Sequence, residues 1–306
     1  MTQRRPDFFL VGAPKCGTTA MARYLGDHPE IFMPIAKELH YFGSDLDYRR
    51  RRLTAAEYLA LFDTGEGVKR VGEASVGYLY SETAPAEILE FSPEARILIM
   101  LRDPIDMIRS QHSQELFMGQ EDITNLAEAL RAEPDRSAGR RIPASCTMPY
   151  LLRYTWLARY AEHVERYLEA VGPGRVHVTL FDDFKRDTSS AYADVVRFLG
   201  CDASFTPEFP VVNERKRVRS VALQHVVRDP PPRVRVMLRR LLPMAARVGA
   251  RKLLYGLNSR APVPSSIEPE LAARLRVDLE PDIRRLADLL GRDLSAWMSS
   301  DHLGAA

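Results

Sequence analysis

Short apolar runs alternate with helical patterns over the first two thirds of the chain. Residues 8–13 are all apolar, and a proline-containing turn follows them, which is typical of a parallel strand buried on both faces. Further buried strands are predicted at residues 70–73, 96–101 and 175–181. Helices are predicted between them, at residues 18–26, 54–62 and 83–91. This alternation predicts an α/β fold, with a P-loop-like, mostly parallel sheet flanked by helices and ligands at the carboxyl ends of its strands.

The pattern becomes mainly helical after residue 101. Helical spacing of apolar residues predicts helices at residues 104–119, 124–136, 150–170 and 189–199, with loops at 136–145 and 206–218. A basic amphipathic helix is predicted from residue 230 to about 251, and a final amphipathic helix over 268–290. One core suits a chain of this length better than two, so we expect a single domain over residues 1–306. Its core would cover about 7–200, and a helical C-terminal extension would cover 230–298.

Composition excludes several classes of protein. The 306 residues are 45% hydrophobic and 27% charged, which is ordinary for a globular chain and excludes a disordered or fibrous one. The 43 Lys and Arg against 41 Asp and Glu give a net charge of +2, which argues against nucleic acid as a partner. That charge is unevenly distributed. Residues 214–260 hold 13 basic and 2 acidic residues, a net +11, so the remainder carries −9.

The three cysteines and the apolar runs bear on location. The cysteines are widely spaced with no CxxC pair, so neither a zinc site nor a disulfide framework is indicated, and a cytoplasmic location is expected. The apolar run near the N-terminus is too short for a signal peptide. No segment approaches the roughly 18 apolar residues that a membrane span needs.

The first strand leads into a glycine-containing loop and then a helix, through Gly12, Lys15, Gly17, Thr18 and Thr19. This order directs free backbone N–H groups and the helix dipole at an anion. The glycines have P-loop spacing, but Thr18 stands where a nucleotide triphosphatase has its lysine, and Lys15 lies inside the loop instead. A plain strand-to-helix turn is the alternative for this loop taken alone.

A second candidate anion site follows the strand at residues 96–101. Arg102 lies at the carboxyl end of that strand, and Ser110 lies about two turns along the next helix, so both could face one anion. A surface arginine beside the helix-capping Asp103 is the alternative. Two anion sites at adjacent strand ends indicate a ligand with two phosphates, one at each end of a nucleoside.

These two segments resemble the sulfotransferases that use 3′-phosphoadenosine 5′-phosphosulfate (PAPS). In that family, the loop seen here at residues 14–19 (PKCGTT) holds the 5′-phosphosulfate, and residues 101–110 resemble the element that holds the 3′-phosphate. Residues 37–42 (KELHYF) resemble the Lys-Glu-x-x-x-Phe block of bacterial carbohydrate-type and heparan-sulfate-type sulfotransferases. Residues 213–220 resemble the loop that closes over the nucleotide, within about 206–220, and residues 286–297 resemble the usual C-terminal helix.

The resemblance implies sulfuryl transfer from PAPS to a hydroxyl, or less readily an amine, of a carbohydrate, glycolipid or secondary metabolite. Glu38 is the expected base, in a segment whose flanking aromatic residues would raise its pKa by partial desolvation. Lys15 is the expected cation at the leaving oxygen, and no metal is required. One departure is Ala74, where heparan-sulfate enzymes often have a lysine. Either Lys15 serves alone, or a cation from the basic loop replaces the missing one.

Further residues are open to two interpretations. His40 could orient the base or the acceptor, or be an ordinary partly buried histidine. The helix N-terminus and Lys15 could favour the thiolate form of Cys16. Alternatively, Cys16 is a small loop residue that contacts the cofactor. Gln114 could line the acceptor side or be solvated.

The basic residues after position 214 have two expected roles. Arg217 and Arg219 are predicted to contact the nucleotide, with a solvated loop as the alternative. The basic helix at 233–252 could meet an acidic acceptor, a peripheral membrane surface or water.

Two other functions compete with the sulfotransferase. A P-loop kinase is favoured by the glycine spacing and opposed by Thr18. A non-catalytic protein that binds a nucleotide or a membrane surface through the basic helix is the second. The sequence identifies neither the acceptor nor the oligomeric state.

Overall fold

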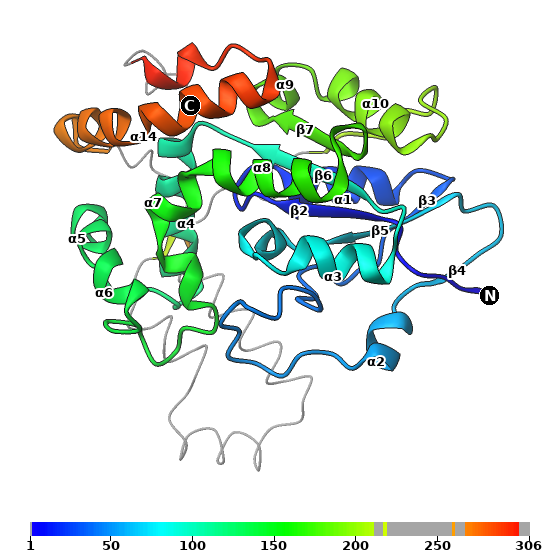
Figure 1. Cartoon of the computed structure of the whole chain (residues 1–306), viewed down its shortest axis with the longest axis horizontal. Coiled ribbons are helices and arrows are strands. Elements are labelled where there is room, and N and C mark those ends of the chain that lie inside the picture. The colour runs from blue at the N-terminus through cyan, green and yellow to red at the C-terminus, as the bar shows by residue number, and fades with distance from the viewer. Residues whose placement is uncertain (1, 211–216, 219–258, 261–266, 300–306) are drawn as a thin grey trace.

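Five parallel strands form the central sheet of the computed structural model, which describes residues 2–210, 217–218, 259–260 and 267–299 (Figure 1). Their order is β3 (Ile31–Phe32), β5 (Arg70–Ala74), β2 (Phe8–Gly12), β6 (Arg96–Leu101) and β7 (Val176–Leu180). All five residues of β2 are buried because neighbouring strands flank it and helices cover both its faces. The sheet confirms the predicted α/β fold and is wholly parallel.

The helices cover the two faces in the way that right-handed crossovers require. The connection from β2 to β3 runs toward one edge of the sheet, and the connection from β5 to β6 runs toward the other edge. Because both crossovers are right-handed, they lie on opposite faces of the sheet. α1 (Thr18–Gly26) packs with α10 (Thr188–Leu199) on one face. α3 (Ala84–Phe91) packs with α8 (Tyr160–Val171) on the other, in front of the sheet in Figure 1. The change of direction occurs beside β2, so the carboxyl end of β2 is where a ligand is expected.

The C-terminal helix α14 (Pro269–Leu290) lies against α8 and against α4 (Pro104–Phe117). Its buried residues recur at helical spacing: Leu271, Ala272, Leu275, Leu279, Ile283 and Leu286. This confirms the helical C-terminal segment predicted from residue 268. The basic helix predicted from residue 230 to about 251 lies outside the described residues.

Two predicted helices are divided in the structure. The helix predicted at 124–136 is α5 (Leu126–Arg131) and α6 (Glu133–Ser137), because Pro134 cannot continue a helix and instead occupies the first turn of a new one. The helix predicted at 150–170 is a 3-10 turn, η2 (Pro149–Leu152), then α7 (Tyr154–Ala158), then α8. All four residues of η2 are buried. A segment buried on every side has no polar face, so it does not continue the predicted amphipathic helix.

The remaining described elements are short. They are β1 (Thr2–Gln3), α2 (Ala55–Leu59), β4 (Asp63–Thr64), η1 (Val76–Tyr80), η3 (Pro173–Arg175), α9 (Phe181–Arg186), β8 (Arg217–Val218), β9 (Ser259–Arg260) and η4 (Ser295–Met298). The strand predicted at 175–181 therefore ends one residue early, since Phe181 begins α9.

Candidate active site

The loop between β2 and α1 has the geometry of an anion site. Gly17 has a φ of +87°, a left-handed conformation that favours glycine, and it is the N-cap residue of α1. No side chain caps the first turn of this nine-residue helix, and no acidic residue lies in it. The N–H groups and dipole at the start of α1 are therefore directed toward the space beyond the end of β2.

Lys15 connects this loop to α4. Its Nζ donates a hydrogen bond to Oε1 of Gln114, 3.1 Å away. Ser110 lies four residues before Gln114, so both side chains lie on the same face of α4. The structure thus brings Lys15, Ser110 and Gln114 together at one end of the sheet, and it gives Gln114 a place beside the loop rather than in solvent.

Arg102 lies at the carboxyl end of β6, next to the same loop. It is buried, its guanidinium contacts the Asp106 carboxylate, and its Nε has no partner among the described residues. The guanidinium lies 4.9 Å from the ring centroid of Phe181. A Cβ atom on Gly17 would lie 3.1 Å from that same ring, so Phe181 places Arg102 and the loop side by side. The two predicted anion sites are neighbours.

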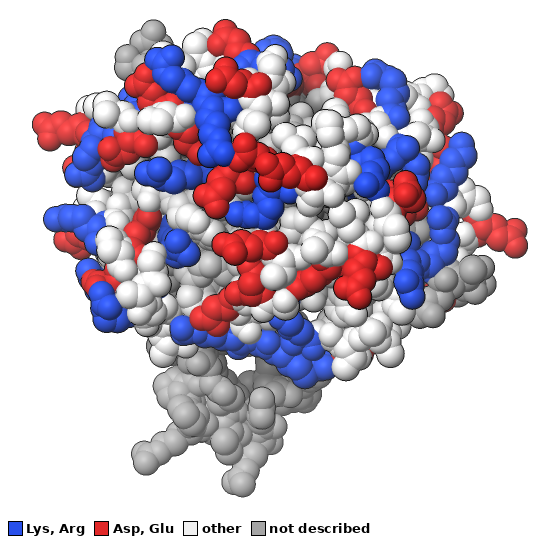
Figure 2. Space-filling model, viewed as in Figure 1, with Lys and Arg blue, Asp and Glu red and all other residues white. Residues whose placement is uncertain are grey.

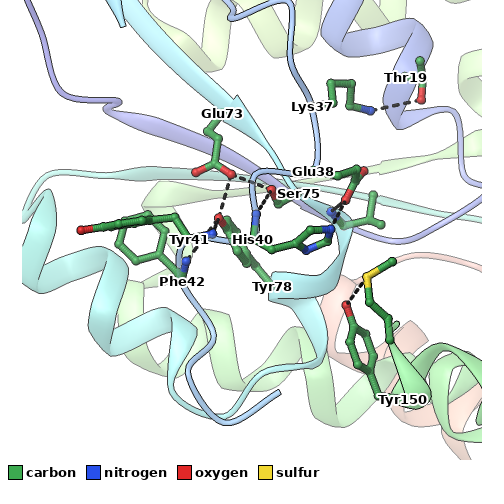
Figure 3. Close-up of polar contacts among 12 residues, drawn as sticks. Thr19, Lys37, Glu38, His40, Tyr41, Phe42, Glu73, Ser75, Tyr78 and Tyr150 are labelled. Atoms are coloured by element: carbon green, nitrogen blue, oxygen red, sulfur yellow. Dashed lines mark hydrogen bonds and ion pairs between the residues drawn. The ribbon is translucent and has the colours of Figure 1, made fainter. Parts of the chain in front are cut away.

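Residues 37–42, here called the Glu38 segment, lie beside the carboxyl end of β5 (Figure 3). The N–H of Glu38 donates to the carbonyl of Ala74 at 2.9 Å, and the N–H of Val76 donates to Oε2 of Glu38 at 3.1 Å. Nε2 of His40 lies 3.8 Å from the same carboxylate oxygen. From the other end of the segment, Nζ of Lys37 donates to Oγ1 of Thr19 at 3.1 Å. The lysine of the segment therefore contacts the first turn of α1, and the carboxylate and the histidine lie beside each other in the same segment.

Comparison with known proteins places this chain in a family. Residues 5–224 match the model of the sulfotransferase domain. The chain belongs to the sulfotransferase family. A solved sulfotransferase from Alicyclobacillus acidocaldarius superposes on it with a TM-score of 0.72 at 29% identity, covering 97% of this chain and 100% of the other.

Curated relatives of this sulfotransferase are larger proteins. Human bifunctional heparan sulfate N-deacetylase/N-sulfotransferase 3 is 29% identical over 209 residues, which cover 64% of this chain and 22% of that protein. Rat carbohydrate sulfotransferase 15 is 29% identical over 149 residues, which cover 35% of this chain and 27% of that protein. The chain thus spans only about a quarter of the length of these curated relatives.

Burial shifts the pKa values of the titratable groups at this site. Burial raises the pKa of Glu38, an effect that the charge of Lys37 and the N–H of Val76 partly offset. The Glu38 side chain nevertheless remains 36% exposed, so a substrate can reach it. Burial lowers the pKa of Lys37, which the Glu38 carboxylate opposes. Burial, together with the charges of Arg52 and Arg50, lowers the pKa of His40 to about 4, so His40 is neutral near pH 7.

The thiolate considered for Cys16 is contradicted. The residue is fully buried, and burial raises the pKa of its thiol to about 12, against the effects of Arg102 and Lys15. The thiol donates to the carbonyl of Pro14 at 3.3 Å. Cys16 is therefore a small buried residue of the loop, because desolvation outweighs the helix N-terminus and the nearby cations.

Two functional candidates, Lys37 and Glu73, do not follow from the sequence patterns. Lys37 was part of the recognised block, but nothing in the sequence indicated that it reaches Thr19. The sequence motifs assign no role to Glu73, although it is fully buried beneath the Glu38 segment. The signal that could have drawn attention to Glu73 is a carboxylate inside an apolar strand pattern, since such a group needs buried partners.

The remaining predicted contacts are only partly described. Arg217 lies in β8, whose backbone is next to α4 and pairs with β9. The side chain of Arg217 and the whole of Arg219 lie outside the described residues. Among the residues that the structure does describe, no group of three His, Cys, Asp or Glu side chains is placed to hold a metal ion. Within the same ranges, no helix is both long and apolar enough to cross a membrane.

Proposed function

We propose that this sulfotransferase transfers the sulfuryl group of PAPS to a hydroxyl of a carbohydrate, glycolipid or secondary-metabolite acceptor, by in-line displacement with Glu38 as the base. An amine is the second acceptor class. The observation that carries the proposal is the hydrogen bond between Lys37 and Thr19, which places the base-bearing segment beside the N-terminus of α1.

The described residues fit a nucleotide with phosphates at both ends. The N-terminus of α1, with Thr18 and Thr19, would hold the 5′-phosphosulfate. Arg102 and Ser110 would hold the 3′-phosphate. The buried Nε of Arg102, which lacks a described partner, is the kind of donor that a phosphate oxygen would satisfy. Arg217 and Arg219 remain proposed contacts from the closing loop.

PAPS, as the co-substrate, supplies the sulfuryl group, and 3′-phosphoadenosine 5′-phosphate departs with the electron pair of the broken S–O bond. Glu38 removes the proton of the acceptor as its oxygen bonds to sulfur. Lys15 stabilises charge on the leaving oxygen, and Lys37 provides the second cation, in place of the lysine that is missing at Ala74. His40 is neutral and orients Glu38 or the acceptor.

The acceptor class rests on the relatives. Their names specify heparan sulfate and carbohydrate sulfotransferases, which supports a glycan as the acceptor. Because one of them is an N-sulfotransferase, an amine remains the second acceptor class. We further propose that residues 1–306 form one sulfotransferase domain that acts in the cytoplasm, with peripheral membrane contact through residues 233–252.

The test is a binding and transfer assay on the purified protein. PAPS should raise the melting temperature, and ³⁵S should pass from labelled PAPS to one member of a panel of N-deacetylated heparosan, chondroitin and simple glycosides. ATP with magnesium should support no transfer. If ATP serves and PAPS neither binds nor stabilises the protein, the kinase alternative replaces this proposal.

A further test separates the two phosphate sites. Arg102→Ala should weaken binding of 3′-phosphoadenosine 5′-phosphate, while binding of adenosine 5′-phosphosulfate, which lacks the 3′-phosphate, should change little. Equal losses for both nucleotides would contradict the assignment of Arg102 to the 3′-phosphate.

A further inference from the structure

A fully buried carboxylate lies behind the Glu38 segment. Glu73, on β5, accepts three hydrogen bonds from hydroxyl groups: Oε1 accepts from Ser75 Oγ at 2.6 Å and from Tyr78 OH at 2.8 Å, and Oε2 accepts from Tyr58 OH at 2.5 Å. Across the described residues, no Lys or Arg forms an ion pair with it, so these hydroxyls satisfy the carboxylate.

Two of the three hydroxyls also contact the Glu38 segment. Each hydroxyl has one hydrogen, and when that hydrogen points at Glu73 the oxygen lone pairs are free to accept from other donors. Ser75 Oγ accepts from the N–H of His40 at 3.3 Å. Tyr78 OH accepts from the N–H groups of Tyr41 at 2.9 Å and Phe42 at 3.3 Å (Figure 3). The carboxylate therefore sets the direction of the hydroxyls, and the hydroxyls hold three consecutive backbone amides.

The Glu38 segment has a backbone that needs such support. Glu38 and His40 have φ values of 58° and 49°, in the left-handed region that residues with a side chain rarely adopt. On the carbonyl side, the Arg52 guanidinium donates to the carbonyls of His40 at 3.0 Å and Phe42 at 2.8 Å. The segment is thus fixed through its N–H groups by the Glu73 hydroxyls and through its carbonyls by Arg52.

We propose that Glu73 is a positioning residue, which orients the Ser75 and Tyr78 hydroxyls so that they hold the Glu38 segment with the Glu38 carboxylate in place for proton removal. This inference rests on the proposed function for the role of Glu38. Glu73 itself, buried beneath the segment, does not contact substrate.

The electrostatics of Glu73 give this role a pH dependence. Burial and, to a smaller extent, the charge of Glu38 raise the pKa of Glu73 to about 7, against the three hydroxyls, which lower it. Above that pH, Glu73 is ionised and accepts from all three hydroxyls. Below it, the Glu73 carboxyl carries a hydrogen of its own. When that hydrogen lies on Oε1, Ser75 or Tyr78 must turn its hydroxyl hydrogen away from Glu73, toward the backbone N–H groups that it would otherwise accept from. Positioning is complete above pH 7 and weakens as the pH falls.

Tyr78→Phe and Tyr58→Phe form a matched pair for the test. Both remove one buried hydroxyl that donates to Glu73 and keep the ring, but only Tyr78 OH also accepts from the Glu38 segment. In hydrogen–deuterium exchange without any nucleotide, the amides of Tyr41 and Phe42 should exchange about tenfold faster in Tyr78→Phe, as expected for a lost hydrogen bond. They should change little in Tyr58→Phe.

The same pair is then compared in turnover. Tyr78→Phe should lower kcat for ³⁵S transfer by up to about 10²-fold, with PAPS binding unchanged, because a small displacement of the base is costly. Tyr58→Phe should keep kcat near wild type. Glu73→Gln should shift the acidic limb of the pH profile, which a merely structural residue would not move.

Equal amide exchange in the two tyrosine variants would overturn the inference, as would equal losses of kcat. The exchange measurement needs no acceptor and no PAPS. If the wild-type protein transfers no sulfuryl group, the proposed function fails, while the exchange result still decides whether the Tyr78 hydroxyl, which donates to Glu73, holds the segment.

Discussion

At the residue scale, the site depends on a carboxylate whose charge is adjusted by burial. Glu38 has a raised pKa, and its neighbours Lys37 and His40 have lowered ones. A raised pKa makes a carboxylate a stronger base, provided that it is ionised at the working pH. The rate should therefore increase with pH through the pKa of Glu38 and level off above it. His40, with a pKa of about 4, contributes no change between pH 6 and 8.

Glu38→Gln tests the base directly. The amide cannot take a proton, so kcat should fall by about 10²- to 10⁴-fold, the usual contribution of a general base. Binding of 3′-phosphoadenosine 5′-phosphate, measured by calorimetry, should remain, and the rise of the residual rate with pH should disappear. A variant with unchanged activity would show instead that this carboxylate is not the base.

The two lysines should have separable effects. Lys15→Ala should weaken PAPS binding and turnover together, because Lys15 lies in the loop itself. Lys37→Ala should lower kcat more than binding, because Lys37 approaches from the segment that carries the base. Lys185→Ala, an exposed lysine on α9, is the control and should change neither quantity. Identical profiles for Lys15→Ala and Lys37→Ala would refute separate roles.

At the scale of elements, the site depends on how closely β5 packs against β2. A Cβ atom on Gly72 would lie 2.1 Å from Cζ of Phe8 and 2.4 Å from Sδ of Met33. Phe8 and Gly72 are paired across the two strands, so neither can move without shifting the sheet. Because β5 continues into Glu73 and Ala74, this contact also sets the position of the Glu38 segment.

Gly72→Ala should destabilise the protein. Overpacking of a close contact costs about 1–3 kcal/mol, so the midpoint of urea unfolding should fall. Gly65→Ala, where nothing lies within 4 Å of the added Cβ, is the matched control and should leave the midpoint nearly unchanged. Equal midpoints for the two variants would mean that the strands adjust more freely than the structure indicates.

The elements also show where sequence patterns succeed. The strand predicted at 96–101 matches β6. Five of its six residues are buried and apolar, as expected for a parallel strand that is covered on both faces. The helix predicted at 18–26 matches α1, because its buried residues repeat at helical spacing. The helix predicted at 150–170 is divided, because a segment buried on all sides loses the period from which a helix is predicted.

At the scale of the whole molecule, charge is divided between two parts of the sequence. Residues 214–260 carry +11 and the rest carries −9. On the face shown in Figure 2, Lys and Arg are interspersed with Asp and Glu over the described surface. Such a mixed face is not suited to an extended anion, and the basic segment is the feature of the sequence that indicates an anionic partner.

Anionic vesicles test the role of that segment. The protein should sediment with phosphatidylserine-containing vesicles at low salt. It should dissociate from them near 1 M salt, because the Debye length there is only about 3 Å and the attraction between charges is screened. Replacing Arg239, Arg240 and Arg247 by Gln should abolish sedimentation. Replacing the exposed Arg131, Arg140 and Arg186 by Gln removes the same charge and should not. Equal losses in the two triple variants, or no sedimentation at low salt, would exclude a membrane role for the segment.

The sequence by itself determined the buried parallel strands and the glycine-containing turn before α1. It also made Lys15 and Arg102 candidates by their places in the pattern, whereas Glu38 became a candidate through the family resemblance. These features are local, since a strand, a turn and a helix N-terminus are encoded by neighbouring residues. The tertiary structure decided which groups meet. The contacts of Lys37 with Thr19, His40 with Ser75, and Lys15 with Gln114 join residues that are 18, 35 and 99 positions apart. No local pattern encodes such pairs, because they depend on the order of the strands and on what the packing of the sheet buries.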